Sequence, residues 1–199
     1  LGFYGVIDER MDLALLAELA ALRPDWAFVM IGPVVKISPD DLPRAANIHW
    51  LGGRDYARLP DYAVHWDVAL MPFALNASTQ YISPTKTPEY MASGLPVVST
   101  PIADVVATYG TLGSIRIAED ARGFVSACEA LLSADPRTRA AWKAEAETCL
   151  ADKSWDGTVA RIARQLQDGL VARQVARISS ARPVHRARHY DVLVVGAGF

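Results

Sequence analysis

Short apolar runs that alternate with helix-like stretches constrain the fold of this chain more than any other feature of its sequence. Residues 26–31 form one continuous apolar run that ends at Gly32 and Pro33, as in a strand that is covered on both faces. Several of the segments between such runs carry apolar residues at helical spacing. Further strand-like runs occupy residues 3–7, 48–51, 68–71, 96–99 and 114–117. This alternation predicts an α/β fold, a Rossmann-like doubly wound parallel sheet.

After residue 119 the pattern becomes helical. Residues 124–132, 136–150 and 155–171 are expected as helices. The last of them has apolar residues along one face: Trp155, Val159, Ile162, Leu166 and Leu170. We expect these extra C-terminal helices to flank or cap the sheet, within a first domain that spans residues 1–172.

The character of the sequence changes at residue 173. From Arg173 to Tyr190 there are five arginines, two histidines, one proline and no acidic residue, which predicts a linker at residues 173–189. Peripheral contact with the inner membrane surface is the alternative interpretation of this arginine-rich stretch, but a solvated linker is favoured. Residues 190–199 combine an apolar run with Gly-x-Gly, which predicts the truncated start of a second Rossmann domain.

Composition and charge exclude several classes of protein. With 51% hydrophobic and 21% charged residues, the chain suits a globular domain with a substantial core. Its formal net charge of −2 gives no basic field of the kind that binds nucleic acid. Cys128 and Cys149 lie outside any CxxC or Cys/His spacing, and no apolar run approaches the roughly 20 residues of a membrane span. We therefore expect a cytoplasmic protein with no structural metal and no nucleic-acid partner.

Two loops are singled out as the candidate binding site. In an open α/β sheet, ligands bind outside the carboxyl ends of the strands, where the strand order reverses. One loop, from Gly5 to Arg10, follows the first expected strand, and the other, from Pro72 to Ser83, follows the fourth. Both loops are therefore expected to face the ligand.

The sequence SPTK at residues 83–86 is typical of the start of a helix. Its serine can cap the helix and its proline suits the first helical position, while Pro88 leaves a second start open, in which Thr87 is the cap. Free N–H groups at a helix start attract phosphate, and Lys86 adds a cation. Glu89 lies close to either start, where its carboxylate can bind the paired hydroxyls of a ribose. Each residue alone also fits an ordinary capping or surface role, but their combination at a switch point favours a phosphate-binding site.

A long motif also resembles a known family. The sequence SPTKTPEYMASGLPVVST, with DVALMPF before it and PIADVV after it, is similar to the C-terminal, donor-binding half of GT-B glycosyltransferases, especially the GT4-like group. The similarity extends over roughly residues 1–170. It implies a glycosyltransferase domain that binds a nucleotide-sugar donor, with UDP expected, and transfers the sugar with retention to a saccharide or lipid-linked acceptor in cell-surface polysaccharide biosynthesis. It implies no cofactor in this chain. The acceptor-binding half is expected before Leu1, so the isolated chain is expected to bind donor without transfer.

The resemblance also implies roles for particular residues. Glu89 matches the second glutamate of the family's Glu-x7-Glu motif, which grips the ribose, whereas the first glutamate is replaced by Tyr81. That replacement leaves the contact to the hydroxyls of the donor sugar open. For Arg10, an ordinary ion pair with Asp or Glu remains an equal alternative to a phosphate contact. The predicted donor-binding residues are Gly5, Arg10, Ser83, Pro84, Thr85, Lys86 and Glu89, with Lys36 and Arg54 as weaker candidates, and no catalytic residue is predicted.

The last ten residues, YDVLVVGAGF, resemble the start of flavoproteins such as UDP-galactopyranose mutases. They are too short to bind FAD by themselves, although a continuing domain would be expected to bind it. A second hypothesis is therefore a non-catalytic nucleotide-sugar-binding module fused to a flavoenzyme. A third is a nucleotide-sugar epimerase of the same architecture.

Overall fold

The computed structural model describes residues 1–151, 153 and 155–180 of the chain. By its internal contacts the chain divides into two compact units. The first is Leu1–Asp152, and the second starts at Lys153.

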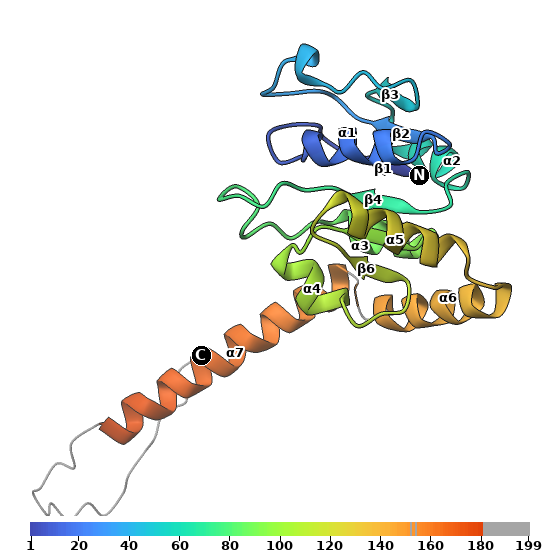
Figure 1. The fold of residues 1–199 in the computed structure, drawn as a ribbon. Helices are drawn as coiled ribbons and strands as arrows, with labels where there is room; N and C mark the ends of the chain where they lie inside the picture. Colours follow the sequence, from blue (N-terminus) through green and yellow to red (C-terminus); the bar gives the residue numbers. More distant parts are fainter. Residues whose placement is uncertain (152, 154, 181–199) are drawn as a thin grey trace, which may run out of the picture. The chain divides into compact units, whose positions relative to one another are not determined.

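A six-stranded sheet, parallel throughout, forms the centre of the first unit (Figure 1). Its order is β3-β2-β1-β4-β5-β6, so the strand order reverses between β1 and β4. Each strand overlaps one of the predicted apolar runs, and the predicted Rossmann-like α/β fold is confirmed. The strands are β1 Gly2–Tyr4, β2 Phe28–Ile31, β3 Ile48–Gly52, β4 Ala69–Met71, β5 Val97–Ser99 and β6 Ile115–Ile117.

Helices connect the strands and cover the sheet. Aspartates begin three of them: the carboxylates of Asp12, Asp120 and Asp135 accept hydrogen bonds from backbone N–H groups of the first turn. Helix α1 packs against α5, and α3 packs against α6. The helices of this unit are α1 Leu13–Leu22, α2 Leu59–Ala63, α3 Lys86–Ala92, α4 Ala103–Tyr109, α5 Ala121–Leu132 and α6 Pro136–Leu150, with 3-10 turns η1 Pro39–Asp41 and η2 Tyr56–Arg58.

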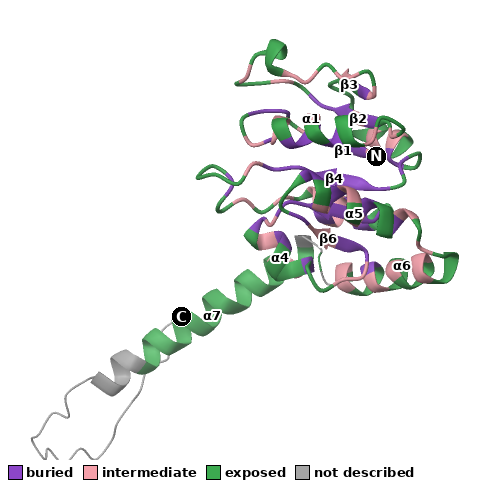
Figure 2. Ribbon diagram, in the orientation of Figure 1, coloured by how far each residue is buried: buried purple, intermediate pink, exposed green. Residues whose placement is uncertain are grey.

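The core follows the central strands, where the buried residues are concentrated (Figure 2). All residues of β1, β4 and β5 are buried, because helices cover both faces of a parallel sheet. Beneath the carboxyl end of β1, the ring of Tyr4 lies 4.8 Å from that of Tyr90 and 6.0 Å from that of Trp66. The hydroxyl of Tyr90 also accepts a hydrogen bond from the Tyr4 backbone N–H at 3.0 Å. This contact fixes α3 against β1.

Helix α7, Trp155–Ser180, is the described part of the second unit. Val159, Ile162, Leu166 and Leu170 lie at the predicted helical spacing, and all four are exposed. The helix continues to Ser180, beyond the predicted end of the helix at residue 171 and through residues 173–180 of the predicted linker. Arg, Gln and Ala in this stretch are good helix formers, and no Gly or Pro interrupts it. The rest of the predicted linker and the predicted flavoprotein start at residues 190–199 lie outside the described residues.

Within the described part of the chain, no helix has the length and apolar character to cross a membrane.

Candidate functional site

The loop after β1 is held between the loops that follow β2 and β4. Ile7 pairs with Val34 and Met11 pairs with Phe73 through isolated bridges. The backbone N–H of Ala74 adds a hydrogen bond to the Arg10 carbonyl oxygen at 2.8 Å. Both loops that the sequence singled out therefore meet at the carboxyl edge of the sheet.

Gly5 and Gly32 allow the end of β1, the end of β2 and the start of α3 to approach one another. Its φ is +143°, and a Cβ atom placed on it would lie 2.0 Å from Lys86 Cε. Gly32, at the end of β2, has no room for a Cβ either, because that atom would lie 1.7 Å from the Gly5 carbonyl oxygen. Glycine tolerates both the backbone conformation and the close approach. As a result, the Lys86 side chain lies directly over the end of β1.

A cavity of about 260 Å³ opens at this edge. We call it the β1–α3 cavity. It brings together three of the predicted site residues, Gly5, Lys86 and Glu89, and the weaker candidate Arg54. A second hollow of about 220 Å³ adjoins it and shares Tyr4, Tyr56, Leu59 and Glu89. The β1–α3 cavity is lined by Tyr4, Gly5, Val6, Ile31, Gly32, Pro33, Arg54, Tyr56, Leu59, Lys86 and Glu89.

Lys86 places an unpaired ammonium group in the β1–α3 cavity. Burial lowers the pKa of Lys86, although the nearby carboxylates of Glu89 and Asp8 oppose that shift. The ammonium nitrogen lies 5.9 Å from the centre of the Phe3 ring. In the described part of the chain, Lys86 has no ion pair with a carboxylate. A partly buried cation without a counter-ion favours an anionic ligand.

Glu89 presents its carboxylate to the same cavity from the first turn of α3. Its Oε1 accepts a hydrogen bond from the Tyr56 hydroxyl at 3.3 Å. Burial, and after it the neighbouring Glu89 carboxylate, raise the pKa of Tyr4, which lines the cavity as well. The Glu89 carboxylate raises the pKa of Tyr56 as well, so both phenols stay protonated at neutral pH and border the carboxylate as hydroxyl groups. The same chemistry suits the hydroxyls of a ribose.

Arg10 lies outside the lining of the β1–α3 cavity and is bound to Asp8. Its Nε lies 3.0 Å from both carboxylate oxygens of Asp8, and Asp8 is only 2% exposed. Burial alone would raise the pKa of Asp8, but the hydrogen bonds and charge of Arg10 outweigh it and lower that pKa. The arrangement matches the ion-pair alternative, so a phosphate contact through Arg10 stays a prediction.

Neither predicted start of α3 is correct. The helix begins at Lys86 with Thr85 at the N-cap position, and no side chain caps it. The Ser83 hydroxyl donates instead to Oδ2 of Asp104 at 2.9 Å, so a carboxylate from α4 replaces the backbone N–H groups as its partner. Pro88 is the third residue of the helix, where a missing N–H leaves no intrahelical bond unmade.

Several residues that the sequence singled out lie outside the β1–α3 cavity. Ser83, Pro84 and Thr85 are absent from the lining of the β1–α3 cavity. The Tyr81 side chain, which replaces the expected glutamate, is 87% exposed. Lys36 is paired with Glu9, since its Nζ lies 3.0 Å from Oε1.

Tyr56 was not predicted as a site residue, although its position after the carboxyl end of a strand is the criterion that identified the other two loops. It follows β3, at the same carboxyl edge as the loops after β1 and β2. Its partner Glu89 lies 33 residues further along the chain. A contact between residues so far apart in the chain cannot be predicted from local sequence spacing.

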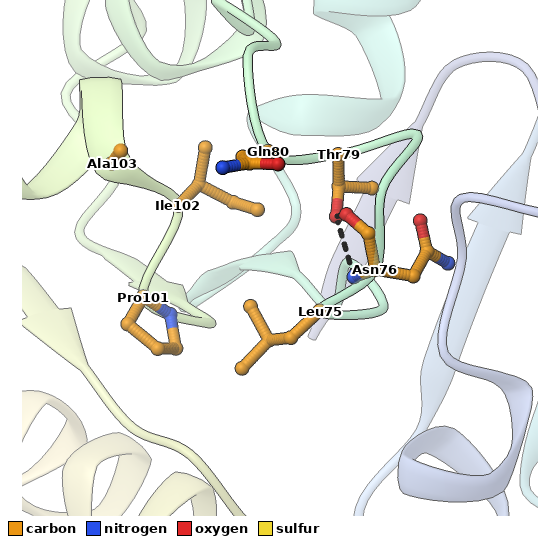
Figure 3. Close-up of a pocket in the computed structure, with 7 residues that line it drawn as sticks. All are labelled: Leu75, Asn76, Thr79, Gln80, Pro101, Ile102 and Ala103. Atoms are coloured by element: carbon orange, nitrogen blue, oxygen red, sulfur yellow. Dashed lines mark hydrogen bonds between the residues drawn. The ribbon is translucent and has the colours of Figure 1, made fainter.

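A further hollow of about 340 Å³ lies on the β4–β5 side of the edge, between the loop 75–80 and residues 101–103 (Figure 3). The side chains of Leu75 and Ile102 point into it, whereas that of Asn76 points away (Figure 3). Thr79 holds the loop in shape, because its hydroxyl bonds to the Ala74 carbonyl oxygen at 2.5 Å and accepts from the Asn76 N–H at 3.1 Å. Its lining is uncharged and shares no residue with the β1–α3 cavity.

Comparison with known sequences gives two matches. Residues 1–134 match the sequence profile of the family Glycosyl transferases group 1. The chain is also 35% identical over 103 residues to TuaH of Bacillus subtilis (strain 168), whose name describes a glycosyltransferase of teichuronic acid biosynthesis. That match covers 50% of this chain and 26% of TuaH.

Solved structures show the same fold. Anabaena HepE, in complex with UDP-glucose, superimposes with a TM-score of 0.62 at 15% identity, covering 84% of this chain and 48% of HepE. Sucrose-phosphate synthase from Thermosynechococcus elongatus gives a TM-score of 0.64 at 17% identity, covering 84% of this chain and 45% of the synthase. The chain thus spans less than half the length of each of these structures.

Proposed function

Because the chain belongs to the family Glycosyl transferases group 1, we propose that its first unit binds the nucleoside diphosphate of a nucleotide-sugar donor for glycosyl transfer. The observation that carries this proposal is the pair formed by Lys86 and Glu89. The two residues lie on one turn of α3, and both line the β1–α3 cavity together with Gly5. One cation and one acceptor of hydroxyl hydrogen bonds are the two groups that a ribose diphosphate requires.

In this proposal the two side chains bind different parts of the donor. Glu89 accepts hydrogen bonds from the ribose hydroxyls, and Lys86 binds the diphosphate that leaves when the glycosidic bond breaks. Charge interactions are stronger in a partly buried site than in water, and burial lowers the pKa of Lys86. A bound diphosphate would offset this shift by stabilising the ammonium form. The contribution of the domain to transfer would then be electrostatic stabilisation of the leaving group.

Uridine is the proposed base, since HepE was solved with UDP and with UDP-glucose. The relation to TuaH, named for teichuronic acid biosynthesis, supports a role in cell-surface polysaccharide biosynthesis. A saccharide or lipid-linked acceptor is proposed from the family resemblance of the motif alone. Retention at the anomeric carbon rests on the family resemblance of the motif around Glu89. The free cysteines Cys128 and Cys149 are consistent with a reducing compartment such as the cytoplasm. Since the chain spans less than half of HepE, we expect it to bind donor without transfer.

Calorimetry with UDP, GDP and dTDP tests this function, with the variant Glu89→Ala measured beside the wild type. We expect UDP to bind best and Glu89→Ala to lose about tenfold to a hundredfold in affinity, because hydrogen bonds to a charged group contribute about 1.5–3 kcal/mol each. The matched control is Glu147→Ala, which removes an exposed carboxylate from α6. Unchanged UDP binding by a folded Glu89→Ala would remove the ribose assignment, and a wild type that binds none of the three would remove the function.

A second candidate function is that of a non-catalytic nucleotide-sugar-binding module. The exposed Tyr81, in place of a carboxylate, favours it. Both functions require UDP binding and differ only in turnover. A longer natural protein containing this chain that binds UDP but neither transfers nor hydrolyses any UDP-sugar would support the module, and transfer to an acceptor would exclude it.

A further inference from the structure

A phenol reaches the Glu89 carboxylate from another element of the fold. Tyr56 belongs to the 3-10 turn after β3, whereas Glu89 belongs to α3. The Tyr56 hydroxyl lies 3.3 Å from Glu89 Oε1, and it is the donor of this hydrogen bond. The contact therefore connects the two sides of the β1–α3 cavity.

The position of this contact gives it access to a ligand. Tyr56 and Glu89 both line the β1–α3 cavity and also the adjoining hollow of about 220 Å³. Tyr56 is 73% exposed, so a ligand in the cavity can approach its hydroxyl. Its hydrogen bond to Glu89 is the one polar contact that the described part of the chain gives its hydroxyl.

A carboxylate has enough acceptor sites to serve both Tyr56 and a ribose. Its two oxygens carry about four lone-pair positions, and Tyr56 occupies one of them on Oε1. The charge of Glu89 and its hydrogen bond raise the pKa of Tyr56, so the hydroxyl remains a donor at neutral pH. A donor that holds one oxygen fixes the plane of the carboxylate, and a fixed acceptor binds a diol with less loss of entropy than a free one.

We propose that Tyr56 is a positioning residue, which orients the Glu89 carboxylate for recognition of the ribose hydroxyls. This inference rests on the proposed function, because it requires that Glu89 faces the ribose. It adds a determinant that distinguishes a ribonucleotide from its 2′-deoxy counterpart. Tyr56 acts through Glu89 and need not touch the reacting atoms.

The test compares UDP with 2′-deoxy-UDP in calorimetric titrations of the whole chain. For the wild type we expect UDP to bind about tenfold more tightly than 2′-deoxy-UDP, since one hydrogen bond to a charged group is lost. In Tyr56→Phe, which keeps the ring and removes the hydroxyl, this ratio should fall to about threefold or less. A residue with a purely structural role would weaken both ligands equally and leave the ratio unchanged.

The matched control is Tyr62→Phe. Tyr62 also carries a phenol close to the cavity, but its hydroxyl accepts from Arg54 Nε at 3.1 Å and makes no contact with Glu89. This variant should keep the wild-type ratio. The double variant Tyr56→Phe, Glu89→Gln should show no further loss of discrimination beyond that of Glu89→Gln alone, because Tyr56 acts through the carboxylate.

The outcomes separate this inference from the proposed function. If the wild type binds UDP and Tyr56→Phe keeps the full ratio, the role of Tyr56 is overturned while the donor site stands. If the wild type binds neither nucleotide, both fall together. A ratio that falls equally in Tyr62→Phe would also overturn the specific role of Tyr56.

Discussion

The Lys86 side chain reaches the β1–α3 cavity across Gly5, and burial there lowers its pKa. It has no carboxylate partner in an ion pair, whereas Arg10 is held by Asp8 and Lys36 by Glu9. Of these three candidate cations, Lys86 is therefore the one whose charge is available to a ligand. The sequence identified all three and left a local ion pair open for Arg10. The partner of Lys36 could not be predicted in this way, because Glu9 lies 27 residues away along the chain.

Replacing Lys86 by alanine should weaken UDP binding by about tenfold and uridine binding hardly at all. The ammonium is proposed to contact the diphosphate, which uridine lacks, and a charge-assisted hydrogen bond contributes about 1.5–3 kcal/mol. Calorimetric titration of both ligands measures the difference.

The control for this change is Lys143→Ala, which removes an exposed lysine from α6 and should affect neither ligand. Equal losses for UDP and uridine in Lys86→Ala would separate Lys86 from the diphosphate.

At the scale of secondary-structure elements, all six strands were predictable from their apolar runs. Strands β1, β4 and β5 are buried throughout, as expected inside a parallel sheet, whereas the edge strands β3 and β6 are only partly buried. The start of α3 was not predictable, because the partner of Ser83 is Asp104, at the beginning of another helix. Helix α7 was expected to end before residue 173, where the apolar periodicity is lost. It continues because the residues that follow include Arg, Gln and Ala, which favour a helix even where no apolar face is present. Local pattern thus predicted the elements but neither the start of α3 nor the end of α7.

The packing of Lys86 over the end of β1 should depend on glycine at position 5. In Gly5→Ala the new Cβ would lie 2.0 Å from Lys86 Cε, and the φ of +143° is strained for any L side chain. We expect the free energy of unfolding to fall by about 1–3 kcal/mol and UDP binding to weaken as Lys86 is displaced. Urea denaturation and calorimetry measure the two effects.

Gly53→Ala provides the comparison, since a Cβ atom at Gly53 meets nothing within 4 Å. Stability and UDP affinity should both stay close to wild type there. If Gly5→Ala behaved like Gly53→Ala, the close packing of Lys86 on Gly5 would not matter to the site.

On the scale of the whole molecule, the first unit carries a complete six-stranded sheet and the whole β1–α3 cavity. The sequence predicted the family and the carboxyl edge as the site, because both depend on the order of strands and on one long motif. Of the residues that line the cavity it predicted Gly5, Lys86 and Glu89, with Arg54 as a weaker candidate, but not the others. Ser83, Pro84 and Thr85 are adjacent to Lys86 in sequence but lie outside the lining, while Tyr56 comes from a distant turn.

A crystal structure of the chain with UDP would test the central claim most directly. We expect the diphosphate within hydrogen-bond distance of Lys86 Nζ, and the ribose hydroxyls on the Glu89 carboxylate with Tyr56 still bound to Oε1. UDP bound in the uncharged hollow between residues 75–80 and 101–103, or bound without contact to Lys86 and Glu89, would contradict the account.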